Sequence, residues 1–291
     1  MRIATFQFQG RRHVGTVSDD LQSVAPFQWT EARASRGAQA LIEDDAIGHQ
    51  NVALTSAPVP MDQVKLEAPL PLPRRNIFCV GRNYHAHARE LASSVFKDNT
   101  PKADAWPIVF TKVPESVTGP HDPVRLPGAA VSTHIDYEAE LAVVIGKGGR
   151  NIARADAMQH VFGYTIINDV TARDVQMRHQ QWDLGKSFDT FCPMGPWIVT
   201  ADALDGSDTR VRCWVNGELR QDAQTTDLIF DIPSLIETCS RGITLHPGDV
   251  IATGTAAGVG QGFTPPRYLK AGDEVRIEID GLGTIENRFV D

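Results

Sequence analysis

The sequence predicts an α+β protein in which a small N-terminal α+β domain precedes a larger, strand-rich domain. Six segments after residue 76 combine apolar and β-branched residues and are bounded by Gly, Pro or Asp turns. Helical periodicity is confined to short stretches that do not alternate regularly with these strands, which favours a mixed or antiparallel sheet over a doubly wound fold. A proline-rich segment separates the first part of the chain from the rest.

The N-terminal part alternates short apolar stretches with polar turns, and one helix is expected from Glu31 to Ile42. Between Ser56 and Asn76 the chain carries five of its 18 prolines: Pro58, Pro60, Pro69, Pro71 and Pro73. Because proline donates no backbone hydrogen bond, we place the linker in this segment. The expected domains are therefore residues 1–70 and residues 71–291.

The larger part of the chain contains the six expected strands. Their sequences are YEAELAVVIG, FGYTIIND, GPWIVT, VRCWVNG, DVIATGT and EVRIEID. The clearest helix covers residues 232 to about 241, since Asp231 can cap its start and Gly242 can close its end. A second helix is expected to begin at Thr171, which forms a TxxD capping box with Asp174.

Composition limits the classes of function. The chain has 42% hydrophobic and 22% charged residues, as soluble globular proteins do, and no apolar run approaches the ~18 residues of a membrane span. Its formal net charge of -8 argues against nucleic acid as a partner. We therefore expect the protein to act on a small molecule. The start lacks a secretory signal pattern, so we expect a cytoplasmic protein, and the four cysteines stand far apart in the sequence, so we expect reduced thiols.

Three acidic residues are candidates for a metal site. Glu138 and Glu140 are two apart on an expected strand and therefore share a face. The next strand ends at Asp169, and strand ends that lead into loops often carry functional groups. An isolated ExE pattern is more often the solvated face of a strand, but three carboxylates without a nearby cysteine suit a hard divalent cation.

Polar residues after Asp169 are candidates for substrate binding. Arg173 and Gln176 are i, i+3 on the helix expected there, and Lys186 follows. Each could be an ordinary surface group, but together they suit the binding of a carboxylate.

A histidine and a glutamate upstream are candidates for a general base. His87 and Glu90 would face each other on a helix expected from Ala86 to Phe96, and a carboxylate beside an imidazole raises its basicity. Such a pair is more often a surface ion pair. The polar stretch 97–106 that follows offers little apolar surface for anchoring, so we expect the helix to be a mobile lid.

These residues lie within ordered motifs that resemble the fumarylacetoacetate hydrolase superfamily, in particular its shorter bacterial-type members such as acylpyruvate hydrolases. The resemblance covers residue 76 to the C-terminus. The motifs are GRNYxxHxxE, KxPxSxxGP, DYExEL, NDVTARDxQ, KSFDTFCPxGP, VNGxxRQ, GDxIxTGTxxGVG and LKxGDxVxxxIxGxGxxxN.

The resemblance implies a β-roll catalytic domain, a homodimer and a role for each matching residue. One divalent metal ion, Mg²⁺ first and Mn²⁺ or Ca²⁺ as alternatives, is expected on Glu138, Glu140 and Asp169. The catalytic residues are expected to be His87, Glu90 and Lys186, and the substrate-binding residues Arg173, Gln176 and Thr255. Where many relatives read TGTP, this chain has alanine at position 256, so the loop that contacts the substrate is expected to be less rigid.

The reaction implied is hydrolysis of a C–C bond in an acylpyruvate or related 2,4-diketo acid through a metal-bound enolate. Oxaloacetate decarboxylation, or isomerisation or hydration of a 2-oxo acid, is the alternative on the same scaffold, because one site can support several outcomes. A non-catalytic metal- or ligand-binding protein is the alternative from another class. The complete set of candidate ligands and the complete dyad argue against that last interpretation.

Overall fold

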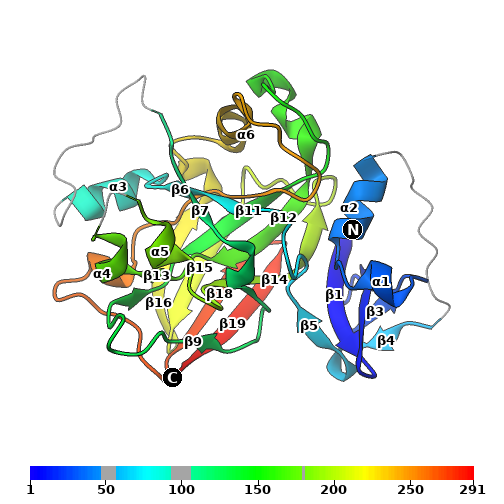
Figure 1. Cartoon of the computed structure of the whole chain (residues 1–291), viewed down its shortest axis with the longest axis horizontal. Coiled ribbons are helices and arrows are strands. Elements are labelled where there is room, and N and C mark those ends of the chain that lie inside the picture. The colour runs from blue at the N-terminus through cyan, green and yellow to red at the C-terminus, as the bar shows by residue number, and fades with distance from the viewer. Residues whose placement is uncertain (47–56, 93–105, 179–180) are drawn as a thin grey trace.

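The structure is a computed structural model, and it describes residues 1–46, 57–92, 106–178 and 181–291. Its described strands form a twelve-stranded sheet, a five-stranded sheet and a two-stranded ribbon (Figure 1). The six strands expected after residue 76 are all present, and the α+β, strand-rich fold class is confirmed. Within the described residues, no helix is both long and apolar enough to cross a lipid bilayer.

The twelve-stranded sheet runs through both expected domains. Its strands are β1 (Arg2–Phe8), β2 (Arg11–Val17), β3 (Ser23–Pro26), β4 (Val59–Pro60), β5 (Lys65–Glu67), β6 (Ile77–Gly81), β7 (Ile108–Lys112), β8 (Val117–Thr118), β11 (Ala139–Ile145), β12 (Val161–Asn168), β14 (Cys192–Thr200) and β17 (Val250–Ala252). Their order is β4-β3-β2-β1-β14-β12-β11-β17-β6-β7, with β5 paired to β1 and β8 to β14. Strands β11 and β12, which contain or adjoin the acidic candidates, are therefore central.

The N-terminal strands join the main sheet at one position. Strand β1 pairs antiparallel with β14, where Ile3 lies opposite Ile198. The proline-rich segment 57–67 is not a bare linker, since it contains β4 and β5 and returns the chain to β3 and β1. The N-terminal unit thus extends the sheet beyond β14 (Figure 1).

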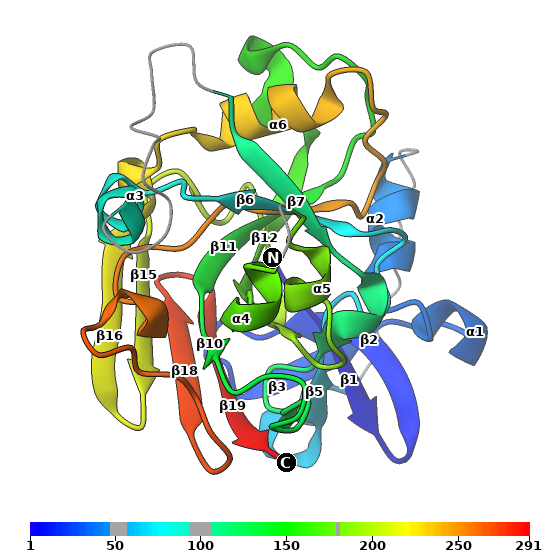
Figure 2. The ribbon, with the colours of Figure 1, turned by 60° about the vertical axis from the view of Figure 1, so that its left-hand side comes forward.

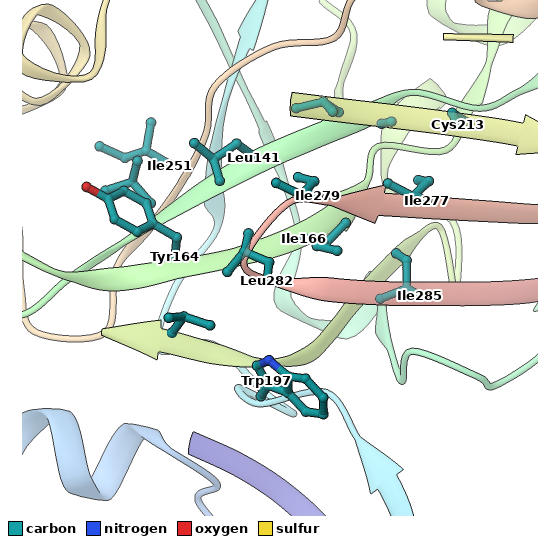
Figure 3. Close-up of a cluster of buried hydrophobic side chains, with 14 of the residues drawn as sticks. Leu141, Tyr164, Ile166, Trp197, Cys213, Ile251, Ile277, Ile279, Leu282 and Ile285 are labelled. Carbon is teal, nitrogen blue, oxygen red and sulfur yellow. The ribbon is translucent and has the colours of Figure 1, made fainter. Parts of the chain in front are cut away.

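The five-stranded sheet packs against one face of the large sheet. Its strands are β9 (Val124–Arg125), β15 (Arg210–Val215), β16 (Glu218–Gln224), β18 (Glu274–Ile279) and β19 (Gly283–Val290), in the order β16-β15-β18-β19-β9. Figure 3 shows the core between the two sheets, where Leu141 and Ile166 of the large sheet belong to one cluster with Ile277, Ile279 and Ile285 of the five-stranded sheet. The two-stranded ribbon pairs β10 (Ile135–Asp136) with β13 (Thr171–Ala172).

Strand β11 divides its side chains between two cores. Leu141 and Val143 belong to the cluster between the sheets, whereas Ala142 and Val144 belong to a second cluster on the opposite face. Because side chains alternate along a strand, Glu140 shares the face of Ala142. The acidic candidates therefore point away from the five-stranded sheet, toward the side where three short helices gather.

The helices are α1 (Glu31–Ala34), α2 (Gln39–Ala46), α3 (His85–Ala92), α4 (Arg173–Gln176), α5 (Asp183–Lys186) and α6 (Ile232–Ser240). Helix α6 confirms the clearest sequence prediction, and the Asp231 side chain accepts a hydrogen bond from the Ser234 backbone N–H at its start. The helix expected over residues 31–42 is wrong as one element, because the chain breaks at Gly37, which takes a left-handed φ of +62°. Figure 2 shows α3, α4 and α5 on the same side of the large sheet.

The capping box expected at Thr171 is also wrong. Thr171 belongs to β13, and its hydroxyl donates to the backbone oxygen of Asp169. Helix α4 starts two residues later, and Asp174 accepts from the Ser132 hydroxyl instead. The pairing of β13 with β10 holds Thr171 in extended backbone, which overrides the local helix signal.

Candidate active site

Three buried carboxylates meet at the ends of the central strands. Glu138 immediately precedes β11, Glu140 is its second residue and Asp169 follows β12. The backbone N–H of Asp169 donates to the Glu138 carbonyl at 2.8 Å, which fixes the two strand ends together. One oxygen from each carboxylate lies within 4.8 Å of the others. The structure thus brings together the residues that the sequence singled out as metal ligands.

Two lysines lie against these carboxylates. Lys186 Nζ is 2.7 Å from Glu138 Oε2 and 2.7 Å from Asp169 Oδ2. Lys112, at the end of β7, is fully buried and donates to Asp169 Oδ1 at 2.8 Å. It also donates to the backbone oxygens of Val170 and Lys186. Sequence reasoning missed Lys112 as a site residue, although it is the first residue of the KxPxSxxGP motif.

Arg173 connects the acidic cluster to a further buried acid. Its Nε donates to Asp136 Oδ2 at 2.8 Å, and its Nη2 forms an ion pair with Glu138 Oε1 at 2.7 Å. Its Nη1 donates to Gln176 Oε1 at 3.3 Å. Arg173 and Gln176 therefore lie side by side as expected, but Asp136, which holds Arg173, had no assigned role in the sequence analysis.

Burial and neighbouring charges shift the ionisation of this cluster. Burial raises the pKa of Glu140, and the negative charges of Asp169 and Glu138 raise it further. Burial also acts on Glu138, but Lys186 and Arg173 outweigh it and hold the pKa of that carboxyl well below its usual range. Burial lowers the pKa of Lys186, yet Asp169 and Glu138 more than compensate, so the pKa rises and the ammonium form is favoured. The cluster thus contains one carboxyl group, Glu140, that lacks sufficient cationic compensation.

Helix α3 places the candidate dyad over the same site. His87 Nδ1 lies 3.0 Å from Glu90 Oε2, and His87 is only 3% exposed. Glu90 Oε1 accepts the backbone N–H of Gly258 at 3.0 Å. The expected helix over residues 86–96 is described as far as Ala92, and the stretch 97–105 of the expected lid lies outside the described residues. The mobility of this lid stays a prediction.

Thr255 lies beside the acidic strand, but its hydroxyl is already engaged. It donates to the Ala139 carbonyl at 3.0 Å and accepts from Gln221 Nε2 at 2.7 Å. Gln221, fully buried on β16, also accepts the Ala139 backbone N–H. The hydroxyl proton of Thr255 is thus used within the protein, and Gln221 is a second structural partner that the sequence did not reveal.

One cavity is lined by two of the three carboxylates, by the histidine of the dyad and by three cationic side chains. It has a volume of about 30 Å³ and is lined by Val80, Gly81, Arg82, His87, Phe110, Glu138, Glu140, Arg173, Gln176, Met177, Trp182, Lys186, Thr255 and Gln261. Arg82 is held in a left-handed conformation with φ of 55°. The adjacent Asn83 fixes this turn, because its side chain bonds to Phe230 N, Phe230 O and Thr253 O.

Comparison with known proteins agrees with this geometry. The profile described as "Fumarylacetoacetate (FAA) hydrolase C-terminal" matches residues 76–290. The chain belongs to the fumarylacetoacetate hydrolase family.

Individual relatives are similar over the whole chain. Oxaloacetate tautomerase YisK of Bacillus subtilis (strain 168) is 45% identical, covering 99% of this chain and 100% of its own. A fumarylacetoacetate hydrolase from Exiguobacterium antarcticum is 39% identical with a TM-score of 0.83, covering 100% of this chain and 99% of its own. Maleylpyruvate hydrolase from Sphingobium sp. SYK-6, solved with manganese(II) and pyruvate, is 36% identical with a TM-score of 0.78 and the same coverages.

The site formed by the three carboxylates fits a divalent cation. The donor set consists of carboxylate oxygens, which hard cations prefer, and the triad is almost wholly buried. The raised pKa of Glu140 shows that one of these charges is poorly compensated by the protein's own cations. A divalent ion at Glu138, Glu140 and Asp169 would supply that compensation.

Proposed function

We propose that this protein is a metal-dependent tautomerase that interconverts the enol and keto forms of oxaloacetate or a closely similar 2-oxo dicarboxylic acid. The observation that carries the proposal is that His87, bonded to Glu90, lines the same cavity as Glu138 and Glu140 of the buried carboxylate triad. The similarity to an oxaloacetate tautomerase over both entire chains supports it. This is the isomerase alternative of the sequence analysis, and the relatives favour it over the hydrolysis expected first.

Glu138, Glu140 and Asp169 hold the metal ion in this proposal, with Mg²⁺ as the expected ion. When bound, such an ion polarises the 2-oxo group and makes the neighbouring C–H bond more acidic. Lys112 and Lys186 keep Asp169 in place from two sides. The protein's part is to fix the ligand geometry before the substrate arrives.

The cationic side chains select an anionic substrate. Arg173 and Lys186 border the carboxylate cluster, where they orient the carboxylate next to the 2-oxo group together with Gln176. Arg82 enters the cavity from the turn after β6 and provides positive charge for a second carboxylate.

His87 is the group that moves the proton. Tautomerisation transfers one proton between the enol oxygen and C3, and it breaks no C–C bond and adds no water. Glu90 orients the imidazole through Nδ1, so the other ring nitrogen is available to accept a proton at one position and return it at the other. A single imidazole therefore suffices for this reaction.

The test is the disappearance of the enol form of oxaloacetate, followed by ultraviolet absorbance in weak buffer with Mg²⁺. We expect His87→Asn to lower the catalysed rate by about 10²–10⁴-fold, the usual contribution of a general acid or base. His85→Asn is the matched control, since His85 is exposed on the same helix. If the wild type does not accelerate enol loss, the proposal fails.

Hydrolysis of an acylpyruvate is the second candidate. Its support is the similarity to maleylpyruvate hydrolase, a structure solved with manganese(II) and pyruvate. A panel of acylpyruvates and oxaloacetate, with pyruvate release as the readout, separates the activities: release from acylpyruvates indicates hydrolysis, and release from oxaloacetate indicates decarboxylation. Binding of oxalate without any turnover would indicate the non-catalytic alternative. The homodimer and the cytoplasmic location stay predictions.

A further inference from the structure

We propose that Asp136 is a positioning residue that couples the substrate-binding Arg173 to the surface on which the catalytic helix α3 docks. Asp136 is fully buried at the end of β10 and two residues before the first candidate metal ligand. It touches neither the cavity nor the candidate dyad directly. Its effect is transmitted through Arg173 on one side and through the loop 258–262 on the other.

The Asp136 carboxylate accepts four hydrogen bonds. Oδ2 accepts from Arg173 Nε at 2.8 Å and from the Gln261 backbone N–H at 2.9 Å. Oδ1 accepts from the backbone N–H groups of Gly260 at 2.6 Å and Tyr137 at 3.0 Å. A carboxylate so fully bonded fixes its partners, because displacing any of them leaves a buried charged group under-satisfied.

The loop 258–262 is the surface on which α3 docks. The Gly258 backbone N–H donates to Glu90 at 3.0 Å, and the Tyr137 hydroxyl donates to the Gly258 carbonyl at 2.7 Å. Gly262 leaves room for the Glu90 carboxylate, since a Cβ at that position would clash with Glu90 Oε1. Asp136 and Tyr137 thus hold the loop in the position that receives Glu90.

Asp136 therefore holds two parts of the site in place, the loop 258–262 and the guanidinium of Arg173. When the loop is in place, Glu90 is docked and orients His87; when Asp136 holds Arg173, that guanidinium is aligned beside Glu138. Loss of Asp136 should therefore impair both substrate binding and proton transfer. Loss of the Glu90 docking surface alone should impair proton transfer only.

The first arm of the test measures amide hydrogen exchange over residues 85–92 in metal-free, ligand-free protein. We expect Asp136→Asn to speed exchange there by about tenfold, as the loss of hydrogen bonds to a charged group implies. Asp273→Asn is the control, because Asp273 is a buried aspartate that holds a distant turn through Asn216 and the Lys270 backbone. Unchanged exchange in Asp136→Asn would overturn the proposal, whatever reaction the enzyme catalyses.

The second arm rests on the proposed function and compares kinetic constants for oxaloacetate. Asp136→Asn should raise KM and lower kcat, each by about tenfold, whereas Gly262→Ala should lower kcat with KM nearly unchanged, because Arg173 keeps its partner. Equal KM increases in the two variants would overturn the coupling. Should Asp136→Asn not fold, Asp136→Glu takes its place, because the longer side chain keeps the charge but displaces the partners of the carboxylate. We then expect faster exchange in α3, a higher KM and a lower kcat. Unchanged exchange and unchanged kinetic constants would overturn the proposal.

Discussion

A substitution of Glu140 is expected to change the stability and the activity of the protein in opposite directions. It is 1% exposed, and one oxygen of its carboxylate lies within 4.8 Å of those of Glu138 and Asp169. At an effective dielectric constant of about 20, two unit negative charges at that distance repel by about 3.5 kcal/mol. Glu140 faces two such charges, which the cations Lys186, Lys112 and Arg173 offset in part, so the net repulsion is at most about 3.5 kcal/mol.

The change Glu140→Gln removes this charge and keeps an oxygen that accepts the Gly254 backbone N–H, now bonded to Glu140 at 2.8 Å. Because partial protonation already relieves some of the repulsion in the parent, we expect the metal-free variant to gain about 1–3 kcal/mol in free energy of unfolding at neutral pH. This corresponds to a melting temperature higher by roughly 2–4 °C per kcal/mol. Turnover should nevertheless be lost, because a proposed metal ligand is missing.

The pH dependence of the stability provides a second test of the uncompensated charge on Glu140. The pKa of Glu140 is raised in the folded state, so the folded state holds this proton more tightly than the unfolded chain does. The metal-free parent should therefore lose stability as the pH rises from the unfolded-state pKa of about 4.3 through the raised folded-state value. The variant should lack this loss.

The assay is thermal melting in EDTA and in Mg²⁺ at several pH values. Saturating Mg²⁺ at about 100 times its Kd should stabilise the parent by about 2.7 kcal/mol and the variant hardly at all. The control is Glu286→Gln, an exposed glutamate on β19. A variant that melts below the parent in EDTA, or that keeps the full Mg²⁺ effect, would refute the reasoning.

Two further changes test neighbouring contacts. Lys112→Met removes a fully buried cation from Asp169 and should cost about 3–5 kcal/mol in chemical denaturation; a loss below 1 kcal/mol would contradict the buried ion pair. Thr255→Val deletes a hydroxyl that bonds Ala139 and Gln221 and should lower stability by about 1–3 kcal/mol while changing KM for oxaloacetate less than about threefold. A larger rise in KM would show that the hydroxyl binds the substrate after all.

Local patterns in the sequence predicted those parts of the fold that local interactions determine. Helix α6 follows from its cap and its apolar periodicity, and β11 and β12 follow from their apolar runs. The helix expected at Thr171 failed because β13 pairs with β10, where Thr171 lies opposite Asp136, 35 positions earlier in the chain. The pairing of β1 with β14 connects residues nearly 200 positions apart, and no local signal specifies it.

The residues of the candidate site also divide into those that local sequence patterns predicted and those that they did not. Glu138, Glu140 and Asp169 could be grouped because strand ends and strand alternation bring them to one face. Lys112 and Asp136 could not, because their roles depend on burial and on partners from other elements. A buried charge is recognisable only with its counter-charge, and that pairing forms in the folded state.

The pairing of β1 with β14 also has a consequence for the behaviour of the chain in solution. Every residue of β14 is buried, and β1 covers backbone donors and acceptors of β14 that would otherwise face outward. An uncovered strand of this kind is a template on which another polypeptide can add by edge-to-edge pairing. The N-terminal strand therefore protects against aggregation. A chain shortened to residues 71–291 would retain every candidate catalytic residue, but it would expose an unpaired, aggregation-prone sheet edge.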